Sequence, residues 1–181
     1  MTIFSPIFAG KLVRLAPPQP EDMPIVASWT HDDDYMRNLD DDPIRPMSVE
    51  QIAQQPQHGD YGFHIRTLEQ DLLIGFVSLF NLKWRNQTAE LAIGIGNPDY
   101  RGRGYGSDAL RLILRYGFDE LNLHHIALTV MDYNSSAIRA YERVGFIKEG
   151  ARREFIVRNG QRYDLLMYGM LRDEWLATLE S

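Results

Sequence analysis

The sequence of 181 residues contains no cysteine. Disulfide bridges, thiolate metal ligands and a cysteine nucleophile for a covalent acyl-enzyme are therefore excluded. A chain without disulfides suits a reducing compartment, so the cytoplasm is the expected location. The most apolar run, residues 72–80, has only about half the length that a membrane-spanning helix needs. No basic stretch precedes the apolar residues of the N-terminus, so no secretory signal is expected.

The sequence also lacks an excess of positive charge, with 19 Lys and Arg against 25 Asp and Glu and a net charge of −6. This balance argues against a general nucleic-acid-binding protein and is compatible with a cationic substrate. None of the five histidines has the spacing of a motif such as H-E-x-x-H, so no metal is expected. The G-x-S-x-G elbow of serine hydrolases is missing as well. The composition, 44% hydrophobic and 24% charged, is typical of one globular domain over residues 1–181.

The most informative stretch, residues 88–121, predicts a strand, a glycine-rich loop and a helix in succession. The strand covers 90–95, has β-branched residues at period two, and ends before Pro98, because proline has no N–H to donate to a sheet. The loop at 101–106 reads RGRGYG, and its glycines permit positive φ and the close approach of a ligand. From 107 to 121, apolar residues recur at the spacing of one helix face.

Several kinds of site compete for this loop. The unpaired amides at the start of the helix, flanked by Arg101 and Arg103, suit a phosphate or pyrophosphate. Residues 104–109 also fit the G-x-G-x-x-A fingerprint of a dinucleotide site, with Asp132 for the ribose, but too few βα units follow to build that domain. A P-loop would need a lysine and a serine or threonine that the loop lacks. A tight turn alone explains one or two of the glycines, and not all three.

The rest of the chain predicts a mixed α/β fold. A buried strand at 125–131 and a helix at 134–144 complete a parallel βαβ crossover with the stretch described above. Asn159-Gly160 predicts a hairpin between the last two strands. The aspartate-rich segment 31–42 is predicted to be a loop or a helix followed by a loop, because aspartate is a poor residue for a helix interior. The other predicted elements are strands at 11–16, 61–67, 72–79, 146–158 and 161–171, helices at 21–29, 48–55 and 172–179, and a polar connection at 81–87.

The glycine loop resembles the Q/R-x-x-G-x-G/A pyrophosphate loop of the GNAT superfamily of acyl-CoA N-acyltransferases. Residues 134–146, NSSAIRAYERVGF, resemble the N-x-x-A-x-x-x-Y-x-x-x-G-F signature of the same family. The start of the chain, at 10–15 and 20–22, and the hairpin segment 155–167 are similar to one branch of it. That branch holds ribosomal-protein N-terminal acetyltransferases and spermidine acetyltransferases. The resemblance covers nearly the whole chain, and its two central motifs are specific in combination.

This resemblance implies a GNAT-like mixed α/β fold of about seven strands, with a central parallel βαβ crossover and a splayed fourth and fifth strand. It implies acetyl-CoA as cosubstrate, with the loop amides on its pyrophosphate and the backbone of 94–96 beside its pantetheine arm. Close backbone approach would explain Gly94 and Gly96, although a strand bulge would explain them too. The residues expected to bind the cosubstrate are Gly94, Ile95, Gly96, Arg101, Gly102, Arg103, Gly104, Tyr105, Gly106, Ser107, Asn134, Ala137 and Tyr141.

Two side chains are expected to be catalytic, one from the resemblance and one from its place on the strand at 90–95. Tyr141 matches the family's tyrosine and is expected to protonate the departing CoA thiolate, although taken alone it would be read as a core tyrosine. Glu90 is expected to remove the amine proton through a water, with a surface or salt-bridged carboxylate as an equal alternative. The N–H of Gly94 or of Ile95 is expected to stabilise the oxyanion. Asn134 is expected to cap its helix and to bind the pantetheine arm.

The expected activity is transfer of an acetyl group to a primary amine by direct attack in a ternary complex. The acceptor is expected to be a polyamine or other small amine, or a protein N-terminus. The aspartates at 32–34 and 40–42 either attract such a cation or are solvated loop charges. By resemblance a homodimer is expected, with neither nucleic acid nor membrane as a partner. The alternatives are a non-catalytic acyl-CoA-binding or sensing domain and a nucleotide-binding oxidoreductase.

Overall fold

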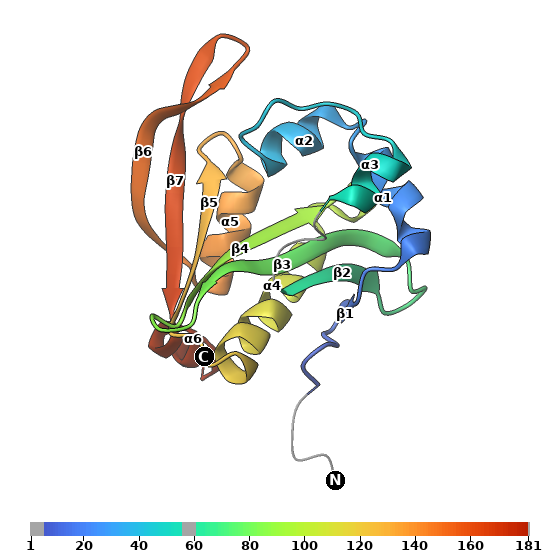
Figure 1. Ribbon diagram of the computed structural model, residues 1–181. Coiled ribbons are helices and arrows are strands. Elements are labelled where there is room, and N and C mark those ends of the chain that lie inside the picture. The colour runs from blue at the N-terminus through green and yellow to red at the C-terminus, as the bar shows by residue number, and fades with distance from the viewer. Residues whose placement is uncertain (1–5, 56–60, 181) are drawn as a thin grey trace.

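In the computed structural model, which describes residues 6–55 and 61–180, one mixed sheet runs through the chain. Its seven strands have the order β1-β2-β3-β4-β5-β7-β6 (Figure 1). Neighbouring strands pair antiparallel, except β4 and β5, which are parallel. This confirms the predicted mixed α/β fold with its single parallel pair. The strands are β1 (Val13–Ala16), β2 (Tyr61–Thr67), β3 (Leu73–Lys83), β4 (Thr88–Ile95), β5 (His125–Met131), β6 (Ile147–Arg158) and β7 (Gln161–Leu171).

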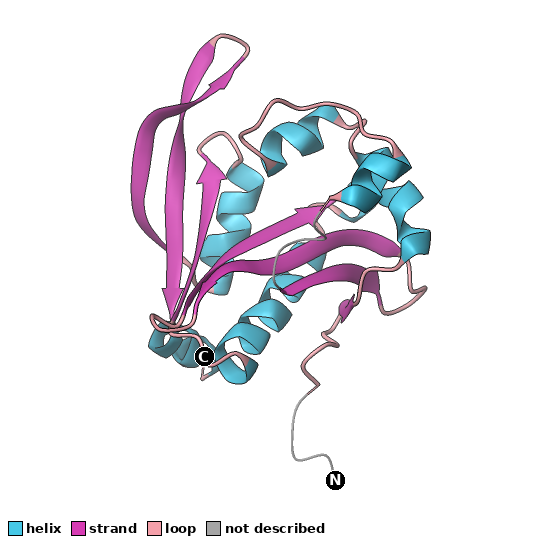
Figure 2. Cartoon of the chain, in the orientation of Figure 1, coloured by secondary structure: helices cyan, strands magenta, loops and turns pink. Residues whose placement is uncertain are grey.

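Helices lie on both sides of the sheet (Figure 2). On one side α4 and α5 cover the buried core, which includes the side chains of Ala89 and Leu91 on β4. Gly94 faces the other side of β4, where α2 packs against it and where α1 and α3 contact each other. The helices are α1 (Met23–Trp29), α2 (Asp33–Leu39), α3 (Val49–Gln54), α4 (Tyr105–Arg115), α5 (Ser135–Val144) and α6 (Arg172–Leu179), with 3-10 turns at Pro20–Asp22 and Pro98–Tyr100 and a π-helical turn at Tyr116–Glu120.

The parallel strands β4 and β5 separate after a short paired segment. Their register joins Thr88 to His125, Ala89 to Ile126 and Glu90 to Ala127, while both strands continue beyond these residues. The rest of β4 keeps its pairing with β3 up to Ile95. This confirms the predicted splay, because the pairing between β4 and β5 stops at Glu90 and leaves the far end of β4 open on that side.

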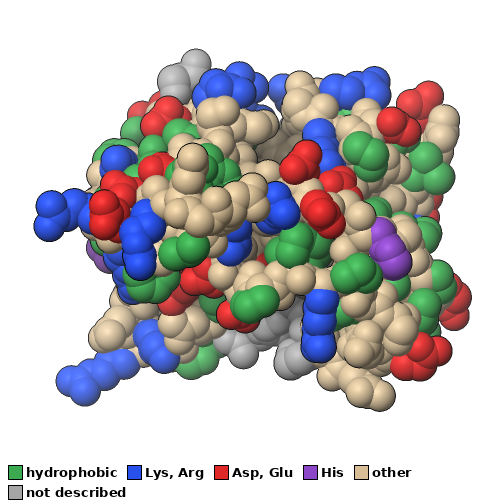
Figure 3. Space-filling view, turned by 90° about the horizontal axis from the view of Figure 1, so that it is seen from above, with side chains coloured by type: hydrophobic (Ala, Val, Ile, Leu, Met, Phe, Trp, Pro, Cys, Tyr) green, Lys and Arg blue, Asp and Glu red, His purple; other side chains and the backbone are tan. Residues whose placement is uncertain are grey.

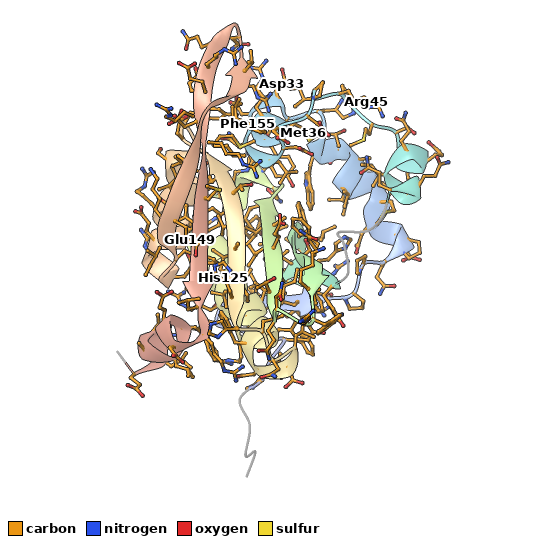
Figure 4. The ribbon with its side chains drawn as sticks, turned by 60° about the vertical axis from the view of Figure 1, so that its left-hand side comes forward. Asp33, Met36, Arg45, His125, Glu149 and Phe155 are labelled. Atoms are coloured by element: carbon orange, nitrogen blue, oxygen red, sulfur yellow. The ribbon has the colours of Figure 1, made fainter. Side chains whose placement is uncertain are left out.

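The C-terminal hairpin of β6 and β7 bends toward α2. Near its base, His125 Nε2 on β5 lies 2.7 Å from Glu149 Oε1 on β6, across the intervening strand β7 (Figure 4). A Cβ at Gly169 of β7 would lie 2.4 Å from His125 Nε2, so this glycine leaves room for the pair. Near the tip, Arg158 Nη2 donates to the carbonyl of Asp40 at 2.6 Å, just after α2. The hairpin is therefore fixed to the sheet at one end and to the α2 region at the other.

Local sequence signals account for most element boundaries. The predicted turn at Asn159 and Gly160 is confirmed, with φ of 50° and 75°. Gly145 ends α5 with φ of 108°, the left-handed conformation that glycine adopts without steric cost. The capping box predicted at Ser48 and Gln51 is present at the start of α3.

The aspartate-rich segment takes the second of its two predicted forms, a helix followed by a loop. It contains the helix α2, because Asp32 is the N-cap and the next two aspartates lie in the first turn, where carboxylates favour a helix. The predicted polar connection at 81–87 is shorter, since β3 continues to Lys83.

Candidate active site

A cavity of about 370 Å³ opens beside the unpaired end of β4. Its lining comes from α2, the end of β4, the glycine loop, the start of α4 and the face of α5. The structure therefore brings together two motifs that lie about thirty residues apart in the sequence. The predicted residues that line the cavity are Gly94, Ile95, Arg101, Gly102, Gly104, Gly106, Ser107, Asn134, Ala137 and Tyr141. The predicted residues outside the lining are Gly96, Arg103, Tyr105 and Glu90.

The glycine loop delivers the start of α4 to the cavity wall. Gly102 and Gly104 have φ of +69° and +91°, values that residues with a side chain rarely adopt. Gly104 is also the N-cap of the helix. Gly106 and Ser107 follow in the first turn and line the cavity with Gly104. Amides of a first helical turn have no acceptor within the helix and carry the positive end of its dipole. This wall therefore suits an anionic group such as a pyrophosphate.

Asp108 fixes the same end of α4 to the beginning of the chain. Its Oδ2 accepts the N–H groups of Lys11, Leu12 and Val13 at 2.9, 2.7 and 3.1 Å. The side chain is buried, and a Cβ at Gly10 would lie 2.5 Å from the same oxygen. Sequence reasoning missed this contact, because its partners are backbone groups 95 to 97 residues away.

The two loop arginines play different parts. Arg101 donates from Nε to the carbonyl of Ile95 at 2.8 Å and from Nη2 to that of Gly96 at 2.6 Å. Its Nη1 also lies 2.9 Å from Asp32 Oδ2. Arg103 is exposed, and its guanidinium lies 5.9 Å from the ring centroids of both Tyr100 and Tyr105. Both arginines were expected to flank the first-turn amides. The structure instead shows the Arg101 guanidinium bound to oxygens of the protein itself.

Gly94 and Gly96 are glycines because aromatic side chains press on the strand. A Cβ at Gly94 would lie 2.7 Å from the Tyr35 hydroxyl, and a Cβ at Gly96 would lie 2.0 Å from Trp29 Cδ2. These distances are far below normal contact, so neither position has room for a side chain. The structure thus gives a reason for both glycines that the sequence did not indicate, namely side chains of α1 and α2, while the expected approach of the pantetheine arm stays a prediction.

Tyr141 and Asn134 occupy the places expected for them on α5. Tyr141 is 8% exposed, lines the cavity, and packs edge-on against Phe146 with ring centroids 5.9 Å apart. Burial raises the pKa of its phenol to about 12. Asn134 caps the helix through its Oδ1, which accepts the Ala137 N–H at 3.2 Å, and this confirms its predicted capping role. Its Nδ2 donates to the carbonyl of Asn38 at 3.4 Å and so reaches α2.

Glu90 is the last residue of β4 that pairs with β5, and it lies opposite Ala127. It is partly buried, and its Oε1 accepts a hydrogen bond from Asn81 Nδ2. Because strand side chains alternate, Glu90 and Gly94 share a face, and the rise between them is about 13 Å. The structure thus places Glu90 on the α2 side of β4, outside the cavity lining.

Residues 13–147 match the acetyltransferase (GNAT) domain family. The chain belongs to the GNAT acetyltransferase family. Among the relatives of this GNAT chain, the SPbeta prophage-derived uncharacterized N-acetyltransferase YokL of Bacillus subtilis is 31% identical over 172 residues, which cover 93% of this chain and 94% of that protein. The putative ribosomal N-acetyltransferase YdaF of Bacillus subtilis is 33% identical over 63% of this chain and 62% of its own length.

Spermidine acetyltransferases are relatives as well. The spermidine N(1)-acetyltransferase of Vibrio cholerae is 35% identical over 111 residues, 61% of this chain and 64% of that protein. A crystal structure of spermidine N-acetyltransferase from Vibrio cholerae in complex with CoA and spermine superposes with a TM-score of 0.81 and 25% identity, covering 91% of this chain and 98% of that one. An acetyltransferase (GNAT family) structure from Bacillus anthracis, 23% identical with a TM-score of 0.78, supports the fold alone. The chain is thus a GNAT N-acetyltransferase.

The GNAT cavity contains side chains that sequence reasoning missed. From α5 come Ser136, Arg139 and Arg143, and both arginines are exposed at the cavity wall. Ser136, Arg139 and Arg143 are three and four residues apart, so they share one helix face near Tyr141, and this spacing was the signal available in the sequence. From α2 come Tyr35, Asn38 and Leu39, for which the sequence carried no motif. Asp34 of the same helix also lines the cavity, and it is one of the aspartates that the sequence analysis considered as attracting a cation.

Side chains of both charges lie at the end of the molecule where the cavity opens. In the view from above, acidic and basic side chains are interspersed over this end of the molecule (Figure 3). Among residues 6–55 and 61–180, no group of three His, Asp or Glu side chains is placed to hold a metal ion. Within the same residues, no helix is both long and apolar enough to cross a membrane.

Proposed function

We propose that the chain transfers an acetyl group from acetyl-CoA to a primary amine by direct attack within a ternary complex. One observation supports this proposal above the others. A single cavity gathers the first-turn amides of α4, the open end of β4 and the buried phenol of Tyr141. These are an anion site, an unpaired strand edge and a proton donor, which are the features that a phosphate-bearing acyl donor needs.

The residues present fit acetyl-CoA, which supplies an activated acetyl thioester. The amides around Gly104 and Ser107 would hold the pyrophosphate, with Arg139 and Arg143 as nearby cations. The open edge of β4 at Gly94 and Ile95 would pair with the pantetheine arm in the manner of an added strand. Asn134, at the start of α5, would bind the same arm through its side-chain amide.

The backbone of β4 would also stabilise the oxyanion. An N–H near Gly94 or Ile95 is fixed by strand pairing with β3 before the reaction begins, as the register of Gly94 with Phe76 shows. Such a donor needs no reorganisation as charge develops on the thioester oxygen, and it acts in a site from which water is partly excluded.

Tyr141 would donate its proton to the departing sulfur. Its pKa, raised to about 12 by burial, keeps the phenol protonated throughout the neutral range. A thiol is a stronger acid than this phenol, with an ordinary pKa of about 8.5. Tyr141 would therefore act mainly as a hydrogen-bond donor to the developing thiolate, and any proton that it passes to the sulfur would be replaced by the one that the amine releases.

Glu90 would accept the amine proton through a water. Only the neutral amine is a nucleophile, so a base on the acceptor side is required. Glu90 is on the α2 face of β4, four residues before the expected oxyanion donor. Its hydrogen bond from Asn81 orients the carboxylate and leaves the second oxygen for a water.

The acceptor would be a polyamine or other small amine, or a protein N-terminus. The spermidine and putative ribosomal relatives support both classes. Acidic side chains of α2 favour a cation, since Asp34 lines the cavity and Asp33 precedes it. Asp33 and Met36 of α2 and Phe155 of β6 lie at the same end of the molecule (Figure 4). This end, between α2 and the hairpin, is where the acceptor would enter.

The test measures CoA release with acetyl-CoA and a panel of acceptors. The panel contains spermidine, a small monoamine and a peptide with a free N-terminus, with the N-terminally acetylated peptide as its matched control. Turnover with at least one free amine and none with the blocked peptide is expected. Calorimetric binding of acetyl-CoA without any modified acceptor would favour a non-catalytic sensor. Binding of NAD without binding of CoA would favour the oxidoreductase.

A further inference from the structure

The side chain of Arg101 joins three elements of the cavity wall. It belongs to the glycine loop, and it holds two carbonyls at the end of β4 through its Nε and Nη2. Through its Nη1 it pairs with Asp32, the N-cap of α2, whose other oxygen accepts the Tyr35 N–H at 3.0 Å. Its guanidinium also lies 5.2 Å from the centroid of the Tyr35 ring. All three guanidinium nitrogens thus have an oxygen partner within the chain.

The helix α2 needs such contacts. Seven residues are far too few for a helix that is stable in isolation, so α2 is held by its neighbours. The Tyr35 hydroxyl and Leu39 Cδ1 both lie against Gly94, where a Cβ would meet them at 2.7 and 3.0 Å. A shift of α2 would therefore also disturb β4 at the expected oxyanion donor.

The electrostatics agree with a structural pair. The pKa of Asp32 is lowered, chiefly by the hydrogen bond from the Tyr35 N–H and further by the bond with Arg101. Both side chains are about one-third exposed, at 33% for Arg101 and 32% for Asp32. The Asp32 carboxylate is thus ionised at neutral pH, and solvent weakens the pair without removing its orienting effect.

We propose that Arg101 is a positioning residue for acetyl transfer, and not a ligand of the pyrophosphate: it holds α2 and the end of β4 in the arrangement that the reaction requires. This inference rests on the proposed function. It leaves the phosphate groups to the amides of α4 and to cations such as Arg103, whose guanidinium is exposed at the loop.

The test compares two thioester donors with an amine that the enzyme accepts. One donor is acetyl-CoA, and the other is S-acetylpantetheine, which carries no phosphate group. The variants are Arg101→Met, Arg101→Lys and, as the matched control from the same loop, Arg103→Met. Arg101→Met is expected to lower kcat by on the order of tenfold to a hundredfold with both donors, while KM for acetyl-CoA changes by less than about threefold. Arg101→Lys, which keeps the charge beside Asp32, is expected to recover part of kcat.

The control variant Arg103→Met gives the kinetic pattern expected when a cation that binds phosphate is removed. Arg103→Met is expected to raise KM for acetyl-CoA and to leave the reaction with S-acetylpantetheine unchanged. The same pattern in Arg101→Met, a loss with acetyl-CoA that disappears with the phosphate-free donor, would overturn the proposal.

Hydrogen exchange of the free protein supplies a readout that needs no turnover. Arg101→Met and Asp32→Asn are each expected to speed amide exchange in α2 severalfold, with exchange in α4 unchanged. Unchanged exchange in α2 for both variants would also overturn the proposal. If the wild-type chain binds neither donor in calorimetry, the proposed function fails, and the exchange result still decides the role of Arg101.

Discussion

The two walls of the cavity are held in place by different means. The donor wall, formed by the glycine loop, α4 and α5, relies on backbone groups fixed by helix caps at Gly104 and Asn134 and by the three amides bound to Asp108. The α2 wall, formed by residues 33–39, relies on side chains that reach it from elsewhere. Tyr133 donates to the carbonyl of Arg37 at 2.7 Å, and Asn134 and Arg101 supply the contacts already described.

This difference matches the two partners that the enzyme would bind. In the proposed function the donor wall would face a cosubstrate whose pyrophosphate is the same in every reaction, so fixed backbone dipoles would be sufficient. The α2 wall would face the acceptor, and single substitutions would adjust a short helix that is tied by a few polar contacts. We therefore expect substitutions in the donor wall to lower kcat or to cause a large loss in the free energy of unfolding. Substitutions that remove a single contact of α2 are expected to cause a small loss.

The largest effect is expected from the donor wall at Tyr141. Tyr141→Phe removes the proton donor and keeps the ring that packs on Phe146. We expect kcat to fall by about 10²- to 10⁴-fold, or about 3–5 kcal/mol in activation free energy, with little change in melting temperature. Steady-state kinetics and a thermal melt measure the two. A chemical step that is unchanged in this variant would show that Tyr141 is only a core side chain.

The next effect tests how rigid the donor wall is. Asp108→Ala leaves the amides of Lys11, Leu12 and Val13 without their acceptor, so we expect a loss of about 3 kcal/mol in the free energy of unfolding. Urea denaturation measures it, with Asp99→Ala at an exposed site as the control. Equal losses for the two aspartates would mean that the contact does not support the wall.

A third change crowds the contact between β4 and α1. Gly96→Ala places a Cβ about where the Trp29 ring now lies, so one of them has to move. We expect a cost of about 1–3 kcal/mol in the free energy of unfolding. Gly106→Ala is the matched control, because its Cβ would lie at a normal 3.7 Å from Ile95 Cγ1 in a helical turn. A denaturation series in which both alanines behave alike would contradict the close approach.

A smaller effect is expected where a single bond ties α2. Tyr133→Phe removes the hydroxyl that donates to the Arg37 carbonyl, and we expect a loss of about 1 kcal/mol. Tyr163→Phe removes an exposed hydroxyl bonded to Gln161 and is the control, with no measurable change expected. If Tyr133→Phe costs as much as Asp108→Ala, the α2 wall is as rigid as the donor wall and the comparison fails.

The pH dependence gives the smallest effect. Burial raises the pKa of Tyr141 to about 12, so the protonated acid form persists above pH 10, where an ordinary phenol is half ionised. Because the folded value lies above the unfolded one, the protonated form is favoured by the fold until the pH passes the folded value. We expect a pH profile of kcat with no loss due to Tyr141 up to about pH 10. A fall near pH 10 that is missing from the residual activity of Tyr141→Phe would contradict this.

The sequence predicted the donor wall well because that wall depends on local rules. Positive φ at Gly102 and Gly104 requires glycine, and the helix cap at Asn134 requires a short polar side chain. The parallel pair followed from the succession of strand, helix and strand, and the strand splay followed from a family resemblance that spans nearly the whole chain. These features leave a pattern of residue types at fixed spacing.

The contacts of the α2 wall were not predicted, because they are long-range. The aspartates at 32–34 were assigned to a loop or to a helix followed by a loop, and no local pattern indicated that one of them caps the helix and pairs with Arg101. Arg101 was expected at a phosphate, and only the fold shows that strand carbonyls and Asp32 surround it. The role of Glu90 as base stays a prediction, since the carboxylate is outside the cavity lining.

The contact between Asp108 and residues 11–13 also has a consequence for the order of events during synthesis. The acceptor of these three amides is made 95 to 97 residues after them. While the chain emerges from the ribosome, the first strand therefore has no partner for its leading amides until α4 has been translated. Closing so large a loop is slow compared with forming a helix. Residues 11–13 are thus translated before α4 and are expected to become fixed only after it has formed.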